Sequence, residues 1–367
     1  MLPRITADLP SLSGPLKLPP GSVSCEEQLL REPLATGDHW WLKCRVEGLS
    51  RKQLVAAVAR AADVPVEVIG CAGGRDRKAV VQQWLSVPKE LVDQPKRFRN
   101  AGYQKKMRVL ETREGKGPIG PELVTGLRWR VQLAGHGNPA GFRTARAILD
   151  ALRQRGCPNF FAARGASTDP SQIRWGRLVA QGKPLPQRVR QAGGDPRRSL
   201  LAFRNELFNR YLVARMADGL HLVRTGDQLE VGCNRPAAKR EQAQAEDPAA
   251  YQARVDSYEA VPLGPLFGRS LVAVSGAAAE LEQRVLAEVE VAASGFAALR
   301  GERRAVRIQP TSAQVEIERK NLTLRCMLPP DAHIGALLRE FVVAREDEPS
   351  IPDEDGADED GVDEFAD

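Results

Sequence analysis

Some segments of the chain have hydrophobic residues at the spacing of a helix, and others have the alternating hydrophobic and polar residues of a strand. Apolar residues at helical spacing predict helices over 50–63, 145–155, 199–218, 277–299 and 334–345. Alternating residues predict strands over 66–69, 129–133, 315–318 and 322–324. Because these helices and strands do not follow one another in strict alternation, the pattern predicts an α+β fold.

Three segments lack either repeat. Residues 1–22 are rich in proline and predict an extended leader, of which 1–14 would precede the first domain. Residues 237–250 are polar and rich in alanine, which predicts a surface loop or an exposed helix. Residues 346–367 carry many acidic and few hydrophobic side chains, so we expect a disordered acidic tail.

The hydrophobic segments are too short for a membrane protein. No stretch reaches the roughly 18 uncharged apolar residues of a membrane helix. The leader also lacks the apolar core of a signal peptide. We therefore expect the protein in the cytoplasm.

Charge is distributed unevenly along the 367 residues. The formal net charge is +6, but residues 346–367 contain 12 acidic and no basic side chains. Residues 1–345 therefore carry 53 Lys and Arg against 35 Asp and Glu, a net of +18. A body this basic favours a polyanionic partner such as nucleic acid, with a merely soluble basic protein as the alternative. The tail either keeps this body soluble or competes with RNA for its binding groove.

Cysteine and histidine spacing indicates neither a metal site nor a disulfide framework. No two cysteines form a C-x-x-C pair, and the histidines are equally scattered. We expect no metal or cofactor, and reduced, mostly buried thiols at Cys25, Cys44, Cys71, Cys157, Cys233 and Cys326.

The segment 70–86 is the most informative for chemistry. A glycine-rich turn delivers one carboxylate, Asp76, between Arg75 on one side and Arg77 and Lys78 on the other. Cations within about 4–6 Å keep a carboxylate ionised, so Asp76 is a candidate nucleophile or base. The alternative is a charged surface turn with Asp76 in an exposed ion pair.

This segment resembles the signature of the TruD family of tRNA pseudouridine synthases, G-x-K-D-x-x-A-x-T-x-Q, whose aspartate is catalytic. The residues that match are Gly73, Asp76, Ala79 and Gln83. Two residues depart from the signature, because Arg75 replaces the lysine and Val81 replaces the threonine.

Further blocks resemble the same family in its order, from about residue 17 to 345. They are Lys17, Glu27, 37–39, 156–161 (similar to G-x-P-N-Y-F), 198–209 (a helix ending in L-F-N), 261–268 (G-P-L-x-G), 302–304, 328–330 and 338–340. The departures are at 126–129, at 162–167 and at 333–335, where His333 begins the segment that holds an aromatic-Ala-Thr triplet in the family.

The resemblance implies a pseudouridine-synthase core with a mainly antiparallel sheet, formed by 15–166 and 309–345. A TruD-type insertion domain would occupy 167–308, and RNA would bind in a cleft between the two. The implied reaction is isomerisation of uridine 13 in the D arm of tRNA, with Asp76 attacking the ribose or abstracting a proton from it. The flipped-out base must be held by stacking.

The resemblance also implies substrate-binding residues. Phe161 would stack on the detached base, with a core phenylalanine as the alternative. Asn159 would line the same pocket or simply hold the turn. Lys17 would pair with Asp76 and keep it ionised, with a solvated lysine in the leader as the alternative, and Arg75 would flank Asp76. A basic strip beside Tyr103 and Met107 suits RNA-backbone contacts, with a solvated face as the alternative. It consists of Lys105, Lys106 and Arg108.

Two functions of different classes therefore remain open: a tRNA-modifying isomerase, and a non-catalytic RNA-binding or RNA-folding factor on the same scaffold. The altered Arg75, Val81 and Gly165 favour the second function. The retained Asp76, Asn159 and Phe161 favour the first. The partner is tRNA in the first case. The oligomeric state is open, with a monomer favoured.

Overall fold

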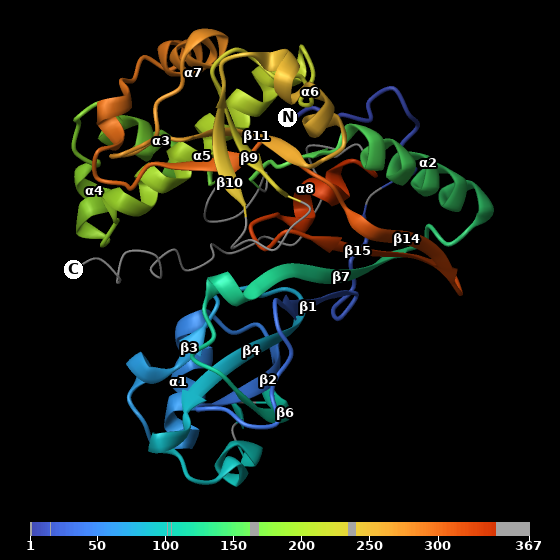
Figure 1. Cartoon of the computed structure of the whole chain (residues 1–367), viewed down its shortest axis with the longest axis vertical. Helices are drawn as coiled ribbons and strands as arrows, with labels where there is room; N and C mark the ends of the chain where they lie inside the picture. The colour runs from blue at the N-terminus through green and yellow to red at the C-terminus, as the bar shows by residue number, and fades with distance from the viewer. Residues whose placement is uncertain are drawn as a thin grey trace. The chain divides into compact units, whose positions relative to one another are not determined.

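The computed structural model of the protein describes residues 2–14, 16–100, 102–103, 105–161, 169–233 and 240–342. These residues form two compact units (Figure 1). The sheet unit comprises 16–142 and 311–331, and the helical unit comprises 2–14, 143–310 and 332–342. Helices and a mainly antiparallel sheet occur together, which confirms the predicted α+β class.

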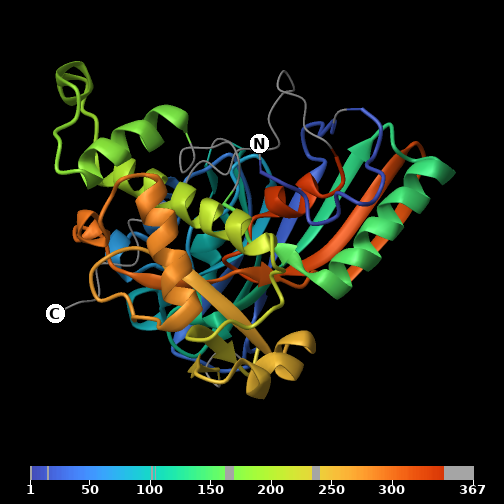
Figure 2. The same ribbon diagram turned by 90° about the horizontal axis from the view of Figure 1, so that it is seen from above.

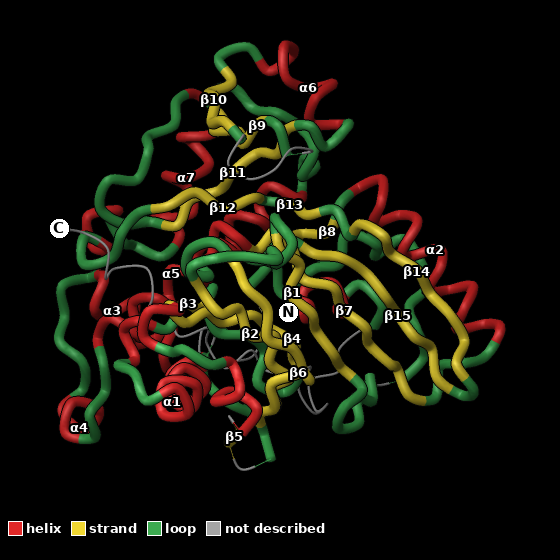
Figure 3. Tube along the Cα trace, turned by 60° about the horizontal axis from the view of Figure 1, so that its bottom comes forward, coloured by secondary structure: helices red, strands yellow, loops and turns green. Residues whose placement is uncertain are grey.

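The sheet unit is built on a nine-stranded sheet (yellow in Figure 3) in the order β14-β15-β7-β1-β4-β2-β6-β5, with β3 also on β4. Its described strand pairs are antiparallel except β1 with β4. The strands are β1 (Val23–Leu29), β2 (His39–Glu47), β3 (Gly70–Cys71), β4 (Val80–Pro88), β5 (Gly102–Tyr103), β6 (Met107–Gly115), β7 (Val124–Ala134), β14 (Thr311–Glu318) and β15 (Asn321–Leu328). The predicted strands over 129–133, 315–318 and 322–324 lie within β7, β14 and β15.

The residues of β7 show why this sheet forms. Trp129, Val131 and Leu133 are buried, and the residues between them, Arg130 among them, point to the other face. The helix α1 (Arg51–Ala62) covers part of the sheet through Leu54 and its neighbours, as Figure 1 shows beside β2, β3 and β4. Ser50 and Gln53 form a capping box at its start, so the predicted helix over 50–63 is confirmed.

The predicted strand over 66–69 is wrong. Residues Val66–Val68 form a 3-10 turn that follows Pro65, and the amide of Ile69 donates to the carbonyl of Val66. Proline fixes the backbone for a turn at this point, so Val66 stays 46% exposed while Ile69 is buried, and the segment pairs with no described strand. Among the described residues, further 3-10 segments are Lys89–Leu91, Pro95–Asn100, Pro121–Leu123 and Ala293–Phe296.

The helical unit is organised around α5 (Pro196–Met216), which begins at the N-cap Asp195 and confirms the predicted helix over 199–218. Its core joins aromatic and aliphatic side chains of α5, α7 and neighbouring loops. The helices are α2 (Pro139–Arg155), α3 (Pro170–Ala180), α4 (Gln187–Gln191), α5, α6 (Pro248–Asp256), α7 (Gly276–Glu288) and α8 (Ile334–Arg339). The strands form a four-stranded sheet, β10-β9-β11-β12, and a pair, β13-β8. They are β8 (Cys157–Pro158), β9 (Asp227–Val231), β10 (Glu241–Ala245), β11 (Ala260–Leu266), β12 (Glu302–Ala305) and β13 (Arg307–Ile308).

Two predicted helices are shorter than expected. The helix expected over 277–299 stops at Glu288, because Glu290 adopts a left-handed backbone and a separate 3-10 turn then buries Phe296. The helix expected over 334–345 is α8, which ends at Arg339. Its last three expected residues, 343–345, lie outside the described residues, as does the tail 346–367.

The expected surface loop or exposed helix over 237–250 is confirmed only at its end, where residues 248–250 begin the helix α6 with Ala249 and Ala250 exposed. Residues Glu241–Ala245 form β10, which pairs with β9, and Asp247 caps the helix α6. The alternating alanines supply the apolar face of this strand, since Ala245 is buried and Ala243 packs against the same small core. Residues 237–239 lie outside the described residues.

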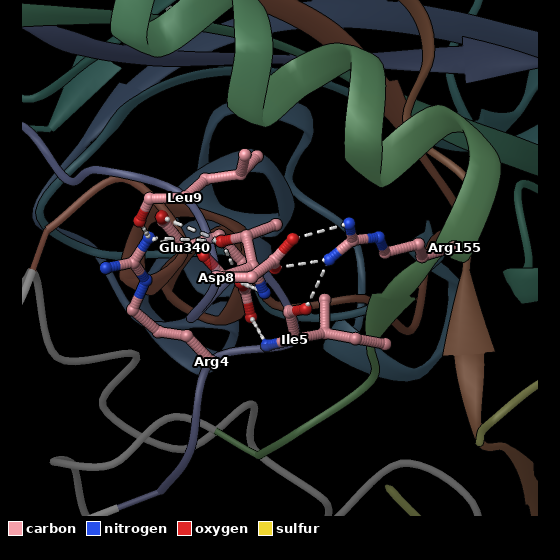
Figure 4. Close-up of polar contacts among 7 residues, drawn as sticks. Arg4, Ile5, Asp8, Leu9, Arg155 and Glu340 are labelled. Atoms are coloured by element: carbon pink, nitrogen blue, oxygen red, sulfur yellow. Dashed lines mark hydrogen bonds and ion pairs between the residues drawn. The ribbon is translucent and has the colours of Figure 1, made fainter.

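The leader is not extended. Residues 5–8 form a turn, and buried Thr6 hydrogen-bonds to Glu340 at the end of α8. Figure 4 shows Ile5, Asp8, Arg155 and Glu340 at this turn. The Glu340 carboxylate accepts hydrogen bonds from the amides of Ile5 and Thr6 and from the Thr6 hydroxyl, at 3.2, 3.1 and 2.7 Å. Arg155 donates to Asp8 at 2.5 and 2.8 Å, and this contact lowers the pKa of Asp8. A proline-rich sequence thus becomes fixed by long-range polar contacts.

The compact units do not follow the domain limits expected from the sequence. Residues 143–161 and 332–342 group with 169–310, whereas the expected insertion domain covered only 167–308. The assignment of 15–166 and 309–345 to a catalytic domain is a statement about function, and it stays a prediction.

A buried ion pair joins α5 to β9 inside the helical unit. Arg215 donates to both oxygens of Asp227 at 2.8 and 2.6 Å, and both side chains are almost completely buried. The amide of Arg224 also donates to Asp227 at 2.8 Å. Because a buried charge without its partner costs far more than an exposed one, this pair constrains the fold.

We predict that Arg215→Met lowers the free energy of unfolding by about 3–5 kcal/mol, because Asp227 would be left buried without its counter-ion. The control is Arg210→Met on the same helix, whose ion pair with Glu206 is exposed and should contribute under about 1 kcal/mol. Denaturant titration measures both. Similar losses in the two variants would contradict a special role for the buried pair.

Candidate active site

The Asp76 carboxylate lies on a tight turn between β3 and β4. Its Oδ1 accepts a hydrogen bond from the amide of Lys78 at 2.8 Å, and its carbonyl accepts one from the amide of Ala79 at 3.3 Å. Gly73 starts the turn with a φ of +146°, which a side chain would strain. Asp76 is only 6% exposed, so the alternative of an exposed ion pair on a charged surface turn is wrong.

A second polar contact holds the start of this turn. Buried Gln83 on β4 donates through Nε2 to the carbonyl of Gly73 at 3.4 Å. Ala79 and Val81 are buried as well, so the β4 end of the turn is anchored in the sheet unit. Burial raises the pKa of the Cys71 thiol, which also borders the turn, so Cys71 stays protonated and is a poor nucleophile.

Arg75 is bound to a buried carboxylate on the neighbouring strand. Its Nη2 lies 2.7 Å from Oε1 of Glu27, and the Glu27 side chain is fully buried. The amide of Trp84 donates to the other oxygen, Oε2, at 2.8 Å. Burial raises the pKa of Glu27, while Arg75 and the Trp84 amide oppose that rise. The contact depends on the parallel pairing of β1 and β4, which brings Glu26 opposite Gln82.

Basic side chains gather at the same end of the sheet as Asp76. Val46 on β2 lies between Val81 on β4 and Met107 on β6, so the turns before those two strands lie about 10 Å apart. The first turn carries exposed Arg77 and Lys78. The second turn and the start of β6 carry exposed Lys105, Lys106 and Arg108. We call these five residues the basic rim.

Lys17 lies ahead of β1 in the same unit. Its side chain is exposed, and its carbonyl accepts a hydrogen bond from the amide of Ala134 at 3.1 Å. The expected ion pair between Lys17 and Asp76 stays a prediction. The side chain of Tyr103, beside the basic rim, lies outside what the structure describes.

Phe161 and Asn159 belong to the helical unit. Asn209 on α5 clamps the backbone of Phe161, accepting from its amide at 2.9 Å and donating to its carbonyl at 3.3 Å. Phe161 is 6% exposed, and its ring packs edge-to-face with that of Phe208. The Arg304 guanidinium lies 4.4 Å from the centre of the ring, within range of a cation–π interaction.

Asn159 is completely buried and supports Arg304. Its Oδ1 accepts from Nη2 of Arg304 at 2.8 Å, and its Nδ2 donates to the carbonyl of Ala305 at 3.0 Å. These contacts describe a positioning role. Contact of Asn159 or Phe161 with a substrate stays a prediction.

The sequence pointed to neither Arg304 nor Asn209 as a site residue, because each acts through a partner more than 45 residues away. The L-F-N block at 207–209 was the available signal for Asn209. His333 stood out in the sequence only as a departure from the family motif, yet its ring lies 5.4 Å from that of Phe161. Burial and the charge of Arg304 lower the pKa of His333 to about 3.

Among the described residues, no group of three or more histidine, cysteine or acidic side chains is arranged to hold a metal ion. All six cysteines are free thiols, and five of them are buried. No described helix combines the length and the apolar character needed to span a membrane.

The sequence matches one protein family over most of its length. The family model for tRNA pseudouridine synthase D (TruD) matches residues 4–164 and 200–341. The chain belongs to the TruD family. Asp76, Asn159, Phe161, Asn209, Arg304 and His333 all lie in the matched ranges.

Named relatives agree with this placement. The tRNA pseudouridine synthase D of Anaeromyxobacter sp. (strain Fw109-5) is 32% identical over 96% of this chain and 99% of its own. A tRNA pseudouridine synthase D of Thermus thermophilus is 28% identical over 96% and 97%. The crystal structure of a TruD protein from Methanosarcina mazei superposes with a TM-score of 0.66 at 19% identity, covering 91% of this chain and 94% of that one, and it supports the fold.

In this TruD-family chain, Arg75 keeps the positive charge of the lysine that it replaces. This charge lies against the Glu27 carboxylate. His333 departs further, because an imidazole with a pKa of about 3 is neutral across the physiological range. The folded-state pKa is below the unfolded value of about 6.5. The stability that neutral His333 confers is therefore fully present above about pH 6.5 and is lost as the pH falls towards 3.

We predict that His333→Phe makes the free energy of unfolding less dependent on pH between about 6.5 and 4, because the ring remains and the titration disappears. The slopes of unfolding free energy against pH should differ between wild type and variant by at most about 1.4 kcal/mol per pH unit. The difference is smaller than this limit because His333 is only half-buried. The matched control is His221→Phe at an exposed position. Equal pH slopes for the wild type and His333→Phe would contradict the neutral imidazole of half-buried His333.

Proposed function

We propose that this chain converts a uridine of tRNA, at position 13 of the D arm, into pseudouridine. Family membership supports the reaction, and the relatives compared above carry it in their names. The observation that carries the proposal for the site is the buried Asp76, held on a glycine turn whose other charged residues are all cations.

The reaction balances within the nucleotide. The bond between ribose C1′ and N1 of the base breaks, and a bond between C1′ and C5 forms. The proton on C5 leaves to water, N1 gains a proton, and no electrons are exchanged. Asp76 acts as the nucleophile at the ribose or as the base that removes a ribose proton, and it is regenerated in either case.

Phe161 would hold the base while it is detached. Asn209 fixes the backbone of Phe161, and Arg304 lies over its ring, so the ring is pre-positioned. Stacking of a base on such a ring is worth about 1–3 kcal/mol. The 6% exposure of Phe161 restricts that contact to a small part of the ring unless the site opens.

The basic rim would contact the RNA backbone around the target uridine. Its five cations lie on two turns at the same end of the sheet as Asp76. Phosphate contacts of this kind position RNA without reading its sequence.

We predict that Asp76→Asn abolishes release of tritium from 5-tritiated uridine in tRNA while tRNA affinity changes by no more than a few-fold. The exposed Asp93→Asn in the same unit is the control and should retain full activity. Turnover by Asp76→Asn would show that Asp76 is neither the nucleophile nor the base of the reaction. Absence of turnover in the wild type itself would favour the non-catalytic RNA-binding function.

We predict that the combined change Lys105→Gln, Lys106→Gln and Arg108→Gln weakens tRNA binding about 10-fold or more at low salt. The slope of log Kd against log salt should also fall by about 1 for each phosphate that the variant no longer neutralises. The combined change Arg60→Gln, Lys96→Gln and Lys116→Gln removes the same charge from other exposed positions of the unit. Equal weakening by both variants would show that net charge, and not the rim, determines binding.

A further inference from the structure

A basic helical arm stands between the two ranges that the family model matches. The matched ranges end at 164 and resume at 200, so α3, α4 and the first turn of α5 fall in the gap. We define the arm as residues 169–198. It carries seven Lys and Arg against two Asp, a net of +5 in 30 residues. Membership of the family therefore says nothing about the purpose of this charge.

The two acidic residues of the arm do not neutralise its cations. Asp169 caps α3, accepting from the amides of Ser171 and Gln172 at 2.7 and 3.2 Å. Asp195 caps α5, accepting from the amide of Arg197 at 2.8 Å. Both carboxylates are thus held at helix starts, where backbone amides already attract negative charge.

Most cations of the arm point to solvent. Arg177 forms an ion pair with Glu290 at 3.2 Å. Within the described ranges, no ion pair occurs at five exposed cations of the arm, which are Arg174, Lys183, Arg188, Arg190 and Arg198. The described exposed large hydrophobic residues include none from the arm, so its surface is electrostatic and not apolar. Such a surface suits a polyanion better than a folded protein partner or a lipid bilayer.

The arm is held in a fixed shape. Gly176 on α3 meets α5 so closely that an added Cβ would lie 2.0 Å from the carbonyl of Ser199. The Ser199 hydroxyl donates to Gln172 at 2.7 Å, and buried Leu185 and Val189 anchor the segment around α4. Figure 2 shows α3, α4 and α5 in green, with α4 at the outer end of the arm. Because the backbone that carries these cations is already fixed, only the side chains lose conformational freedom when they bind phosphates.

The base of the arm lies near Phe161 within the same unit. Ser199, which contacts α3, and Phe208, which contacts Phe161, are nine residues apart on α5. That separation corresponds to about 14 Å along the helix. An RNA strand whose base reached Phe161 would have neighbouring phosphates within range of the arm.

From these observations we infer that the arm is an accessory binding surface for the phosphodiester backbone of the RNA substrate, outside the nucleotides that take part in the reaction. The inference rests on the proposed function only for the identity of the RNA. It adds a set of contacts that the matched family ranges do not include.

The test is a four-site variant with Arg174→Gln, Lys183→Gln, Arg188→Gln and Arg190→Gln in the full chain. Its Kd for unmodified tRNA is measured by fluorescence anisotropy over a series of salt concentrations. We expect affinity to fall about 10- to 100-fold at low salt, and the slope of log Kd against log salt to decrease by about 2–4. An unchanged thermal midpoint would show that the variant is folded.

The matched control removes four exposed cations elsewhere, with Arg143→Gln, Arg284→Gln, Arg319→Gln and Lys320→Gln. We expect its salt slope to stay close to that of the wild type. An arm variant with wild-type Kd and slope, or a control that weakens binding equally, would overturn the inference. Tritium release by the wild type tests the proposed function separately, so failure of that function is distinguishable from failure of the arm.

Discussion

The contact between Glu27 and Arg75 is the constraint on which the candidate site depends. A fully buried carboxylate is costly, and here Arg75 and the Trp84 amide are the groups that compensate it. Glu27 comes from β1 and Trp84 from β4, the one parallel pair among the described strands of the sheet. The turn that carries Asp76 is therefore held by the register of two strands. A slip of one residue would turn Glu27 to the other face and release Arg75.

In the helical unit, too, buried polar side chains fix an irregular segment. Asn209 on α5 satisfies both backbone groups of Phe161, as a neighbouring strand would. Asn159 in turn holds Arg304, whose guanidinium lies over the Phe161 ring. In both units a buried polar side chain fixes a short irregular segment, and that segment carries the residue proposed to meet RNA. Irregular backbone can serve chemistry here because regular elements determine its position.

Local patterns predicted much of the fold. Apolar residues at helical spacing predicted α1 and α5, and the alternation around Trp129 predicted β7. The predictions failed where tertiary contacts decide. A 3-10 segment follows Pro65 where a strand was expected. The strand β10, which pairs with β9, lies where a surface loop or exposed helix was expected.

In the candidate site, too, local patterns predicted individual residues but not the contacts between distant ones. Glycine and charge patterns identified Asp76 and Arg75, and family motifs identified Phe161 and Asn159. The contacts of Glu27 with Arg75 and of Asn159 with Arg304 span 48 and 145 residues respectively, and no local pattern encodes them. Thr6 and Glu340 are 334 residues apart, and no local pattern encodes the contact that fixes the leader, so the sequence predicted an extended leader.

The central claim is that this chain makes pseudouridine in tRNA, and mapping of pseudouridine at nucleotide resolution tests it most directly. Total tRNA is compared from cells that carry the gene, cells that lack it, and deleted cells that express Asp76→Asn. We predict that pseudouridine at position 13 is present in the first and absent from the other two. An identical pseudouridine map in all three would contradict the claim.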